Sequence, residues 1–137
     1  MNAVDTNVLI YAVSSDEQVK GPVALQLLDG LSATDTLLLW QVVCELGSVL
    51  AKLKRLGRAP ADIGSIVAAV RSRFPLVMPS PAVLDECLRL HHELSFSYWD
   101  AMLIAACREA GVDRLYSEDL PGREVSGLVV ENPFVGL

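Results

Sequence analysis

Four acidic residues lie far apart in the chain, each at or just beyond the end of an apolar run, where a side chain is expected to face solvent. They are Asp5, Glu45, Asp100 and Asp119. If the fold brings them together, like charges repel, and either one carboxyl keeps its proton or a cation neutralises the group. Apart from Cys44 next to Glu45, no His or Cys stands beside these acids, and oxygen ligands select Mg²⁺ or Mn²⁺ over zinc. The sequence therefore predicts a magnesium or manganese site that these four residues hold.

Each of these acids also has a simpler explanation when it is taken alone. Asp5 and Asp100 can serve as helix caps or favourable first-turn acids, and Asp119 can be a turn residue. Glu45 fits such an explanation less well, because it interrupts an apolar helix start and a buried carboxylate needs a partner. The tandem pair His91 and His92 cannot face one metal from neighbouring helix positions.

The elements that must position these acids can be read from apolar periodicity and from turn residues. The sequence predicts short strands at residues 2–4, 37–40, 76–78, 114–116 and 129–131. Between them it predicts helices at residues 8–13, 19–31, 41–56, 63–73, 81–94 and 100–110. This alternation predicts an α/β fold, with one parallel five-stranded sheet and helices on both faces. We expect a single domain over residues 1–137.

Parallel sheets bind ligands beyond the carboxyl ends of their strands. Asp5 and Asp119 each follow a predicted strand. Glu45 and Asp100 are expected in first helical turns, which lie on the same side because each helix leaves from the carboxyl end of a strand. We therefore expect all four acids to face one crevice.

The composition is that of a compact globular domain. Of 137 residues, 52% are hydrophobic and 20% are charged, which argues against disorder. No uncharged apolar run reaches about 18 residues, so we expect no membrane span. No basic segment precedes an apolar stretch at the start, so we expect a cytoplasmic protein without a secretory signal. The three cysteines have no C-x-x-C spacing, and we expect them to be reduced and buried.

The net charge of −6 argues against a nucleic-acid partner, but the basic residues are unevenly distributed. Six of the eleven Lys and Arg residues lie between positions 52 and 73, where Asp62 is the only acid. These six, which we call the basic cluster, are Lys52, Lys54, Arg55, Arg58, Arg71 and Arg73. Such a cluster is either a solvated helix face or a surface for a polyanion.

Four segments of the chain, in their order, resemble the motifs of the PIN-domain nucleases. They read D-T-N-V-L-I, Q-V-V-C-E-L, W-D-A-M-L-I-A-A and L-Y-S-E-D-L. The ending G-L-V-V-E-N-P-F is similar to the tail of the toxin in VapBC-type toxin-antitoxin pairs. The resemblance covers nearly the full length. It implies a five-stranded parallel sheet, an acidic site for Mg²⁺ or Mn²⁺, and hydrolysis of phosphodiester bonds in RNA.

The resemblance also assigns roles to residues of this chain. It implies that the catalytic residues and metal ligands are, in family order, Asp5, Glu45, Asp100 and Asp119. The implied supporting residues are Thr6, Asn7, Ser117 and Glu118. Glu118 is ambiguous, because it could replace or assist Asp119 as the fourth acid.

The expected partners follow from the same resemblance. It implies an RNA substrate, a homodimer, and a small antitoxin that inserts a basic side chain among the carboxylates. The basic cluster is then expected to bind the RNA backbone. Trp99 and Tyr98 are expected near the site, where they could stack on bases, whereas Trp40 is expected to anchor the core.

Two other functions remain open at this point. One is a haloacid-dehalogenase-like phosphatase with Asp5 as nucleophile, although such enzymes want D-x-D and residue 7 is Asn. The other is a catalytically silent PIN-like binding module.

Overall fold

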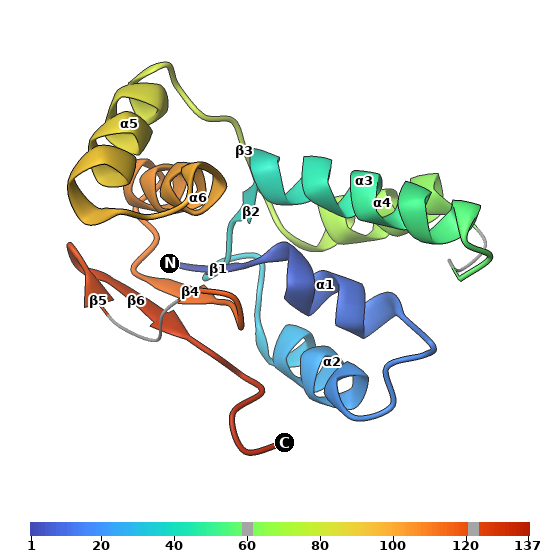
Figure 1. The fold of residues 1–137 in the computed structure, drawn as a ribbon. Coiled ribbons are helices and arrows are strands. Elements are labelled where there is room, and N and C mark those ends of the chain that lie inside the picture. Colours follow the sequence, from blue (N-terminus) through green and yellow to red (C-terminus); the bar gives the residue numbers. More distant parts are fainter. Residues whose placement is uncertain (59–61, 121–123) are drawn as a thin grey trace.

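The computed structural model describes residues 1–58, 62–120 and 124–137, in which helices alternate with short strands (Figure 1). The elements in chain order are β1 (Asn2–Val4), α1 (Thr6–Val13), α2 (Lys20–Gly30), β2 (Leu38–Leu39), α3 (Trp40–Arg55), α4 (Ile63–Arg73), β3 (Leu76–Val77), α5 (Ala82–Leu94), α6 (Tyr98–Glu109), β4 (Arg114–Tyr116), β5 (Glu124–Val125) and β6 (Leu128–Glu131). Helices α5 and α6 lie on one side of the main sheet, and α1 and α2 lie on the other. The expected α/β class is therefore confirmed.

The expected sheet of five parallel strands is wrong. The main sheet has four strands in the order β1-β4-β6-β5. Strands β1, β4 and β6 are parallel, and β5 is antiparallel to β6. Strands β2 and β3 instead form a parallel pair of their own, and an isolated bridge between Asn2 and Thr36 links the start of this segment to β1. Strands of two residues carry too few side chains to show in sequence which neighbour they pair with.

The start of α3 also differs from the expectation. Strand β2 ends at Leu39, and Trp40 already belongs to the helix. As a result, Trp40 is 42% exposed and is not the core anchor that was expected. Glu45 lies in the second turn of α3 and not in the first. Cys44, which was expected to be buried, is exposed on the same helix.

The core side of α3 shows why this helix forms. Val42, Leu46 and Leu50 recur at four-residue spacing and are fully buried, so they make one apolar stripe that faces the core. Burying each leucine contributes about 1.5–3 kcal/mol. Gln41 and Glu45 lie on another face of the same helix, so core packing fixes where they point. In the parts of the chain that the structure describes, no helix is long and apolar enough to cross a membrane.

Two backbone hydrogen bonds extend the sheet just beyond its carboxyl edge. The Asp5 N–H donates to the Tyr116 carbonyl at 2.9 Å, and the Ser117 N–H donates to the Glu131 carbonyl at 2.9 Å. Asp5 and Ser117 therefore continue β1 and β4 as neighbours. The first residues after two strands, far apart in sequence, stand side by side at this edge.

Candidate active site

A pocket of about 320 Å³ lies beyond this edge of the sheet, and all four acids identified from the sequence line it. Its lining residues are Asp5, Thr6, Asn7, Ile10, Tyr11, Gln41, Glu45, Val49, Trp99, Asp100, Leu103 and Asp119. We call it the acidic pocket. None of these described lining residues is basic, so no Lys or Arg of the wall balances the carboxylates.

Asp5 is the most deeply buried of the four acids, with 8% of its surface exposed. It is the N-cap of α1, and its Oδ1 accepts a hydrogen bond from the Thr6 N–H at 2.7 Å. Its Oδ2 accepts one from the Ser117 hydroxyl at 2.7 Å. Burial raises the pKa of Asp5 above its ordinary value, the two hydrogen bonds oppose this, and the charges of Glu45 and Asp119 add to the increase.

Glu45 is held by hydrogen bonds at both carboxylate oxygens. The Thr6 hydroxyl donates to its Oε2 at 3.0 Å, and the Gln41 amide donates to its Oε1 at 3.0 Å. Gln41 is not among the site residues expected from the sequence. A signal was present, because residues four apart on a helix are neighbours and Gln41 precedes Glu45 by four positions.

Asn7 connects the first and the last acidic segments. Its amide donates to Asp119 Oδ2 at 3.0 Å, and the Asp119 N–H donates to the Ser117 hydroxyl at 3.2 Å. The Asn7 Oδ1 is buried and has no hydrogen-bond partner among the described residues. A buried acceptor without a donor is costly, and a cation would relieve that cost.

The structure separates Glu118 from Asp119. Glu118 does not line the acidic pocket, and its carboxylate accepts hydrogen bonds from the Tyr11 hydroxyl and, at 2.8 Å, from the Lys20 ammonium. Burial alone would raise the pKa of Glu118, but the bonds from Lys20 and Tyr11 outweigh it and hold the pKa below its ordinary value. Glu118 is therefore occupied by an ion pair, and Asp119 is the acid that faces the pocket.

Asp100 reaches the pocket from the first turn of α6. Its N–H donates to the hydroxyl of Ser97, the N-cap, at 3.2 Å. Asp100 is therefore not the cap of this helix, and its carboxylate is directed by the turn that Ser97 fixes. The neighbouring Trp99 also lines the pocket and is 64% exposed.

The donor set of the acidic pocket fits a hard divalent cation. It consists of carboxylate oxygens and the unpartnered Asn7 Oδ1. Burial and, to a smaller extent, the charges of Glu45 and Asp119 raise the pKa of Asp5, and a bound cation would oppose this. Within the residues described, no three Asp, Glu, His or Cys side chains stand close enough to hold one ion together. Joint ligation therefore requires the carboxylates to move closer together within the pocket.

The basic cluster lies outside the acidic pocket and is not uniform. Lys52, Lys54 and Arg55 occupy the last turn of α3. Arg58 forms an ion pair with Asp16 at 3.4 Å. Arg71 and Arg73 are in the last turn of α4, where the Arg73 guanidinium donates to the Leu28 carbonyl at 2.6 Å. Lys52 stands two helical turns, about 10 Å, beyond Glu45 on a similar face of α3.

Fold and site together define an α/β domain with an acidic pocket at the carboxyl edge of its sheet. The family model of the PIN domain matches residues 3–126. The chain therefore belongs to the PIN domain family. No curated protein matches the sequence significantly.

Several solved structures share the fold over most of their length. A toxin-antitoxin complex from Klebsiella pneumoniae superposes with a TM-score of 0.67 and 19% identity, covering 97% of this chain and 98% of that one. VapC20 from Mycobacterium tuberculosis, described as a Sarcin-Ricin loop cleaving toxin, superposes with a TM-score of 0.66 and 17% identity, covering 87% of this chain and 92% of that one. VapBC2 from Rickettsia felis, bound to a promoter DNA fragment, superposes with a TM-score of 0.68 and 16% identity, covering 96% of this chain and 97% of that one.

Proposed function

We propose that this protein is a metal-dependent endoribonuclease that acts as the toxin of a toxin-antitoxin pair. The observation that carries the proposal is the acidic pocket, where four carboxylates from four separate segments meet without a basic residue in the described wall. Membership of the PIN domain family supports it. So does the similarity to a structure described as a Sarcin-Ricin loop cleaving toxin.

In this proposal Asp5, Glu45, Asp100 and Asp119 hold Mg²⁺ or Mn²⁺. When bound, the ion supplies Lewis-acid polarisation of the scissile phosphate and a more acidic water. Hydrolysis by in-line attack of a water would leave a 5′ phosphate on one fragment and a 3′ hydroxyl on the other.

The remaining pocket residues position these acids. Thr6 and Ser117 donate to Glu45 and Asp5, so each carboxylate directs its other lone pairs toward the pocket. Gln41 orients Glu45 from one turn earlier on the same helix. Asn7 holds Asp119 with its amide and keeps its carbonyl oxygen free for a cation or water. Positioning of this kind tunes the ligands of a metal site.

No observation favours a phosphatase with Asp5 as nucleophile. Both Asp5 oxygens already accept hydrogen bonds from within the fold, which makes the carboxylate a poor nucleophile. Residue 7 is Asn where a second Asp would be required, and its amide bonds Asp119.

The proposed protein partner is a small antitoxin. A pocket of carboxylates without a basic wall residue would accept an Arg or Lys side chain, which forms strong charge-assisted hydrogen bonds with carboxylates. Three similar structures are described as complexes of such pairs or as bound to DNA. We also propose a homodimer, which sedimentation velocity of the purified protein would test.

The test of the nuclease proposal is cleavage of RNA by the purified protein with and without Mg²⁺ or Mn²⁺. We expect cleavage that requires the ion and that falls by at least about a hundredfold in Asp100→Asn. Glu118→Gln is the matched control, since it removes a neighbouring carboxylate that does not line the pocket.

Three outcomes would count against the proposal. Cleavage that persists in chelator, or that Asp100→Asn leaves unchanged, would indicate a contaminating or different nuclease. Absence of both cleavage and calorimetric ion binding would favour the silent binding module. Circular dichroism of each variant separates loss of activity from loss of fold.

A further inference from the structure

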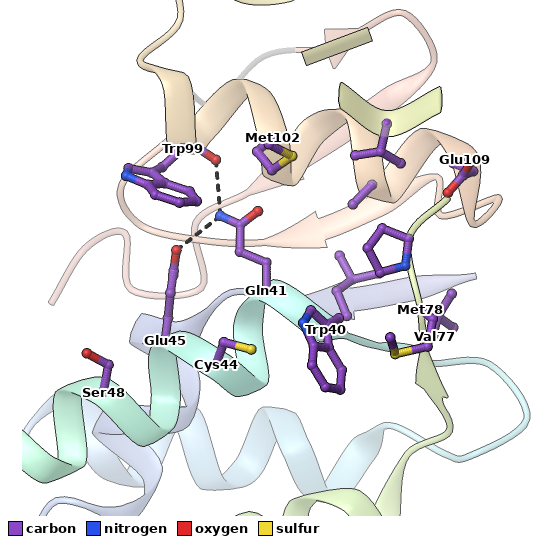
Figure 2. A pocket seen from close by; sticks show the side chains of 14 residues that line it. Trp40, Gln41, Cys44, Glu45, Ser48, Val77, Met78, Trp99, Met102 and Glu109 are labelled. Carbon is purple, nitrogen blue, oxygen red and sulfur yellow. Dashed lines mark hydrogen bonds between the residues drawn. The ribbon is translucent and has the colours of Figure 1, made fainter. Parts of the chain in front are cut away.

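A second and larger pocket, of about 540 Å³, adjoins the acidic pocket (Figure 2). The two pockets share Gln41, Glu45 and Trp99. Most of the remaining wall is apolar, and its large side chains include Trp40, Met78 and Met102. We call it the apolar pocket. A ligand that places a phosphate at the carboxylates would therefore have an apolar recess directly beside it.

One polar atom in this recess has no partner. The Gln41 amide nitrogen donates to Glu45 Oε1 at 3.0 Å and to the Trp99 carbonyl at 3.1 Å. Both partners are acceptors, so the hydrogen bonds fix which end of the amide is the NH₂ group. The other end, Oε1, is buried and unpaired among the described residues, and Figure 2 shows it on the side of Met102, away from Glu45. A ligand N–H that reaches this buried acceptor would satisfy it.

Two aromatic rings border the same recess. Trp40 and Trp99 are the two tryptophans of the chain, and they are 42% and 64% exposed. Tyr98 packs edge-on against Trp99, with ring centroids 5.8 Å apart. Indole faces beside a nucleic-acid site are platforms on which bases stack.

We propose that the apolar pocket binds the base of one RNA nucleotide next to the scissile phosphate. The base stacks on an indole, and an N–H on its edge donates to Gln41 Oε1. The inference rests on the proposed nuclease function, because it names how that site would recognise its RNA.

The chemistry of the wall indicates which bases fit. The unpaired acceptor of the wall is Gln41 Oε1, so the pocket favours a base edge that carries an amino group. Adenine, cytosine and guanine carry one, whereas the N3–H of uracil is flanked by two carbonyl oxygens. A phosphate would not fit here, since the titratable residues of the wall include Glu45 and Glu109 and no Lys or Arg.

The thiol of Cys44 can report whether the apolar pocket is occupied. Cys44 lines it and is exposed, whereas Cys87 and Cys107 are buried. A thiol reagent should therefore modify Cys44 first, and an occupied pocket should slow that reaction. The Cys44→Ser variant identifies the signal.

The experiment measures Cys44 modification in Asp100→Asn protein with Mg²⁺, which keeps the RNA intact. The probes are single-stranded RNA pentanucleotides, either complete or with one base removed at each position in turn. We expect protection by the complete RNA, and loss of protection when one particular base is missing. We also expect Trp99→Ala to weaken RNA binding roughly tenfold to a hundredfold, and Leu88→Ala, an exposed residue outside the pocket, to have no effect.

The variant Gln41→Met separates base reading from stacking, because it retains the length of the side chain and removes the acceptor. We expect it to abolish the preference of oligo(A) or oligo(C) over oligo(U) while protection of Cys44 by RNA remains. The same preference in the wild type and in Gln41→Met would overturn the assignment of Gln41.

Other outcomes would overturn the inference as a whole. Equal protection by every base-deleted RNA would show that the pocket binds no base. If Cys44 were already protected without RNA, and if the protection grew with protein concentration together with a dimer in sedimentation, the occupant would be a second copy of this chain. Base-dependent protection without any RNA cleavage would leave the base pocket standing and reject the nuclease proposal instead.

Discussion

Asp5 is the residue at which the fold and the proposed function oppose each other. Its pKa is raised by burial and by the neighbouring charges of Glu45 and Asp119, so the folded state favours the protonated carboxyl. The protonated Asp5 carboxyl therefore stabilises the folded state. This stabilisation is fully present below the ordinary pKa of 3.8 and is lost as the pH rises through the raised pKa of the folded state. At neutral pH the ionised group destabilises the fold, and a bound cation would offset this.

This linkage predicts that Asp5→Asn stabilises the protein at pH 7 in the absence of divalent ions. The amide removes the charge and retains an acceptor for the Thr6 N–H, so we expect a gain on the order of 1 kcal/mol. The gain should shrink as the pH falls toward 3.8. Thermal unfolding across this range, with and without Mg²⁺, measures it. A lower melting temperature for Asp5→Asn at pH 7 would show that the hydrogen bonds from Thr6 and Ser117 outweigh the repulsion.

The neighbours Glu118 and Asp119 should respond differently to loss of charge. We expect Asp119→Asn to reduce RNA cleavage by at least about a hundredfold with little change in stability, because it faces the acidic pocket. We expect Glu118→Gln to retain most activity and to lower the melting temperature, because it loses the ion pair with Lys20.

The pH dependence provides the control for this comparison. The pKa of Glu118 is held below its ordinary 4.5, so its stabilisation is present above that value and is lost as the pH falls through the folded pKa. The stability difference between wild type and Glu118→Gln should therefore narrow in acid. The reverse pattern of activity losses would assign the fourth acid to Glu118.

At the scale of elements, α6 shows how a helix start orients a side chain of the acidic pocket. The Ser97 hydroxyl accepts from the Asp100 N–H, which fixes the first turn. We expect Ser97→Ala to destabilise the fold by about 1 kcal/mol and to reduce cleavage, since Asp100 loses its orientation. Ser97→Asn, which can cap equally well, should restore both unfolding free energy and activity. Recovery of stability without activity would indicate that the hydroxyl has a role besides capping.

The same elements explain how much could be predicted from the sequence. Helices such as α3 were predictable, because Val42, Leu46 and Leu50 repeat at the helical period. Strand pairing was not, because β2 and β5 have two residues each and carry no alternation to set a register. The start of α3 was placed one residue too late, at residue 41, so the exposure of Trp40 was not predicted.

The site was predictable to the extent that it depends on chain order. Strand ends and helix starts on one edge placed Asp5 and Asp119 correctly in one pocket. The choice between Glu118 and Asp119 needed Lys20, which is 98 positions away from Glu118 in sequence. The Gln41 amide donates to both Glu45 and the Trp99 carbonyl. The contact between Gln41 and Trp99 spans 58 positions, so no local sequence pattern indicates it.

For the molecule as a whole, the acidic pocket and the basic end of α3 are separate, and this separation would affect how a polyanionic substrate binds. The chain carries a net charge of −6, and four of its carboxylates line the acidic pocket. The last turn of α3 carries Lys52, Lys54 and Arg55. In the proposed function, RNA that approaches the pocket would be repelled by the net negative charge and attracted by this turn. Binding strength should then depend steeply on salt, because each neutralised phosphate releases a counterion.

Members of the basic cluster should contribute unequally to that dependence. Lys52 lies about 10 Å beyond Glu45 along α3 and is free to meet a phosphate near the cut, so Lys52→Ala should reduce the slope of log affinity against log salt by about 0.7. Arg73 instead donates to the Leu28 carbonyl and lies over the Phe74 ring. Arg73→Ala should therefore cost about 1 kcal/mol of stability and leave the slope unchanged.

Fluorescence anisotropy of a labelled single-stranded RNA, titrated at several salt concentrations with Asp100→Asn protein, measures both slopes. Asp100→Asn alone is the reference, and chemical unfolding of each double variant gives the stability term separately. If Arg73→Ala lowered the slope as much as Lys52→Ala does, its bond to Leu28 would have to open when RNA binds. The end of α4 would then belong to the RNA-binding surface together with the end of α3. Equal slopes in all three proteins would instead place the RNA backbone away from the basic cluster.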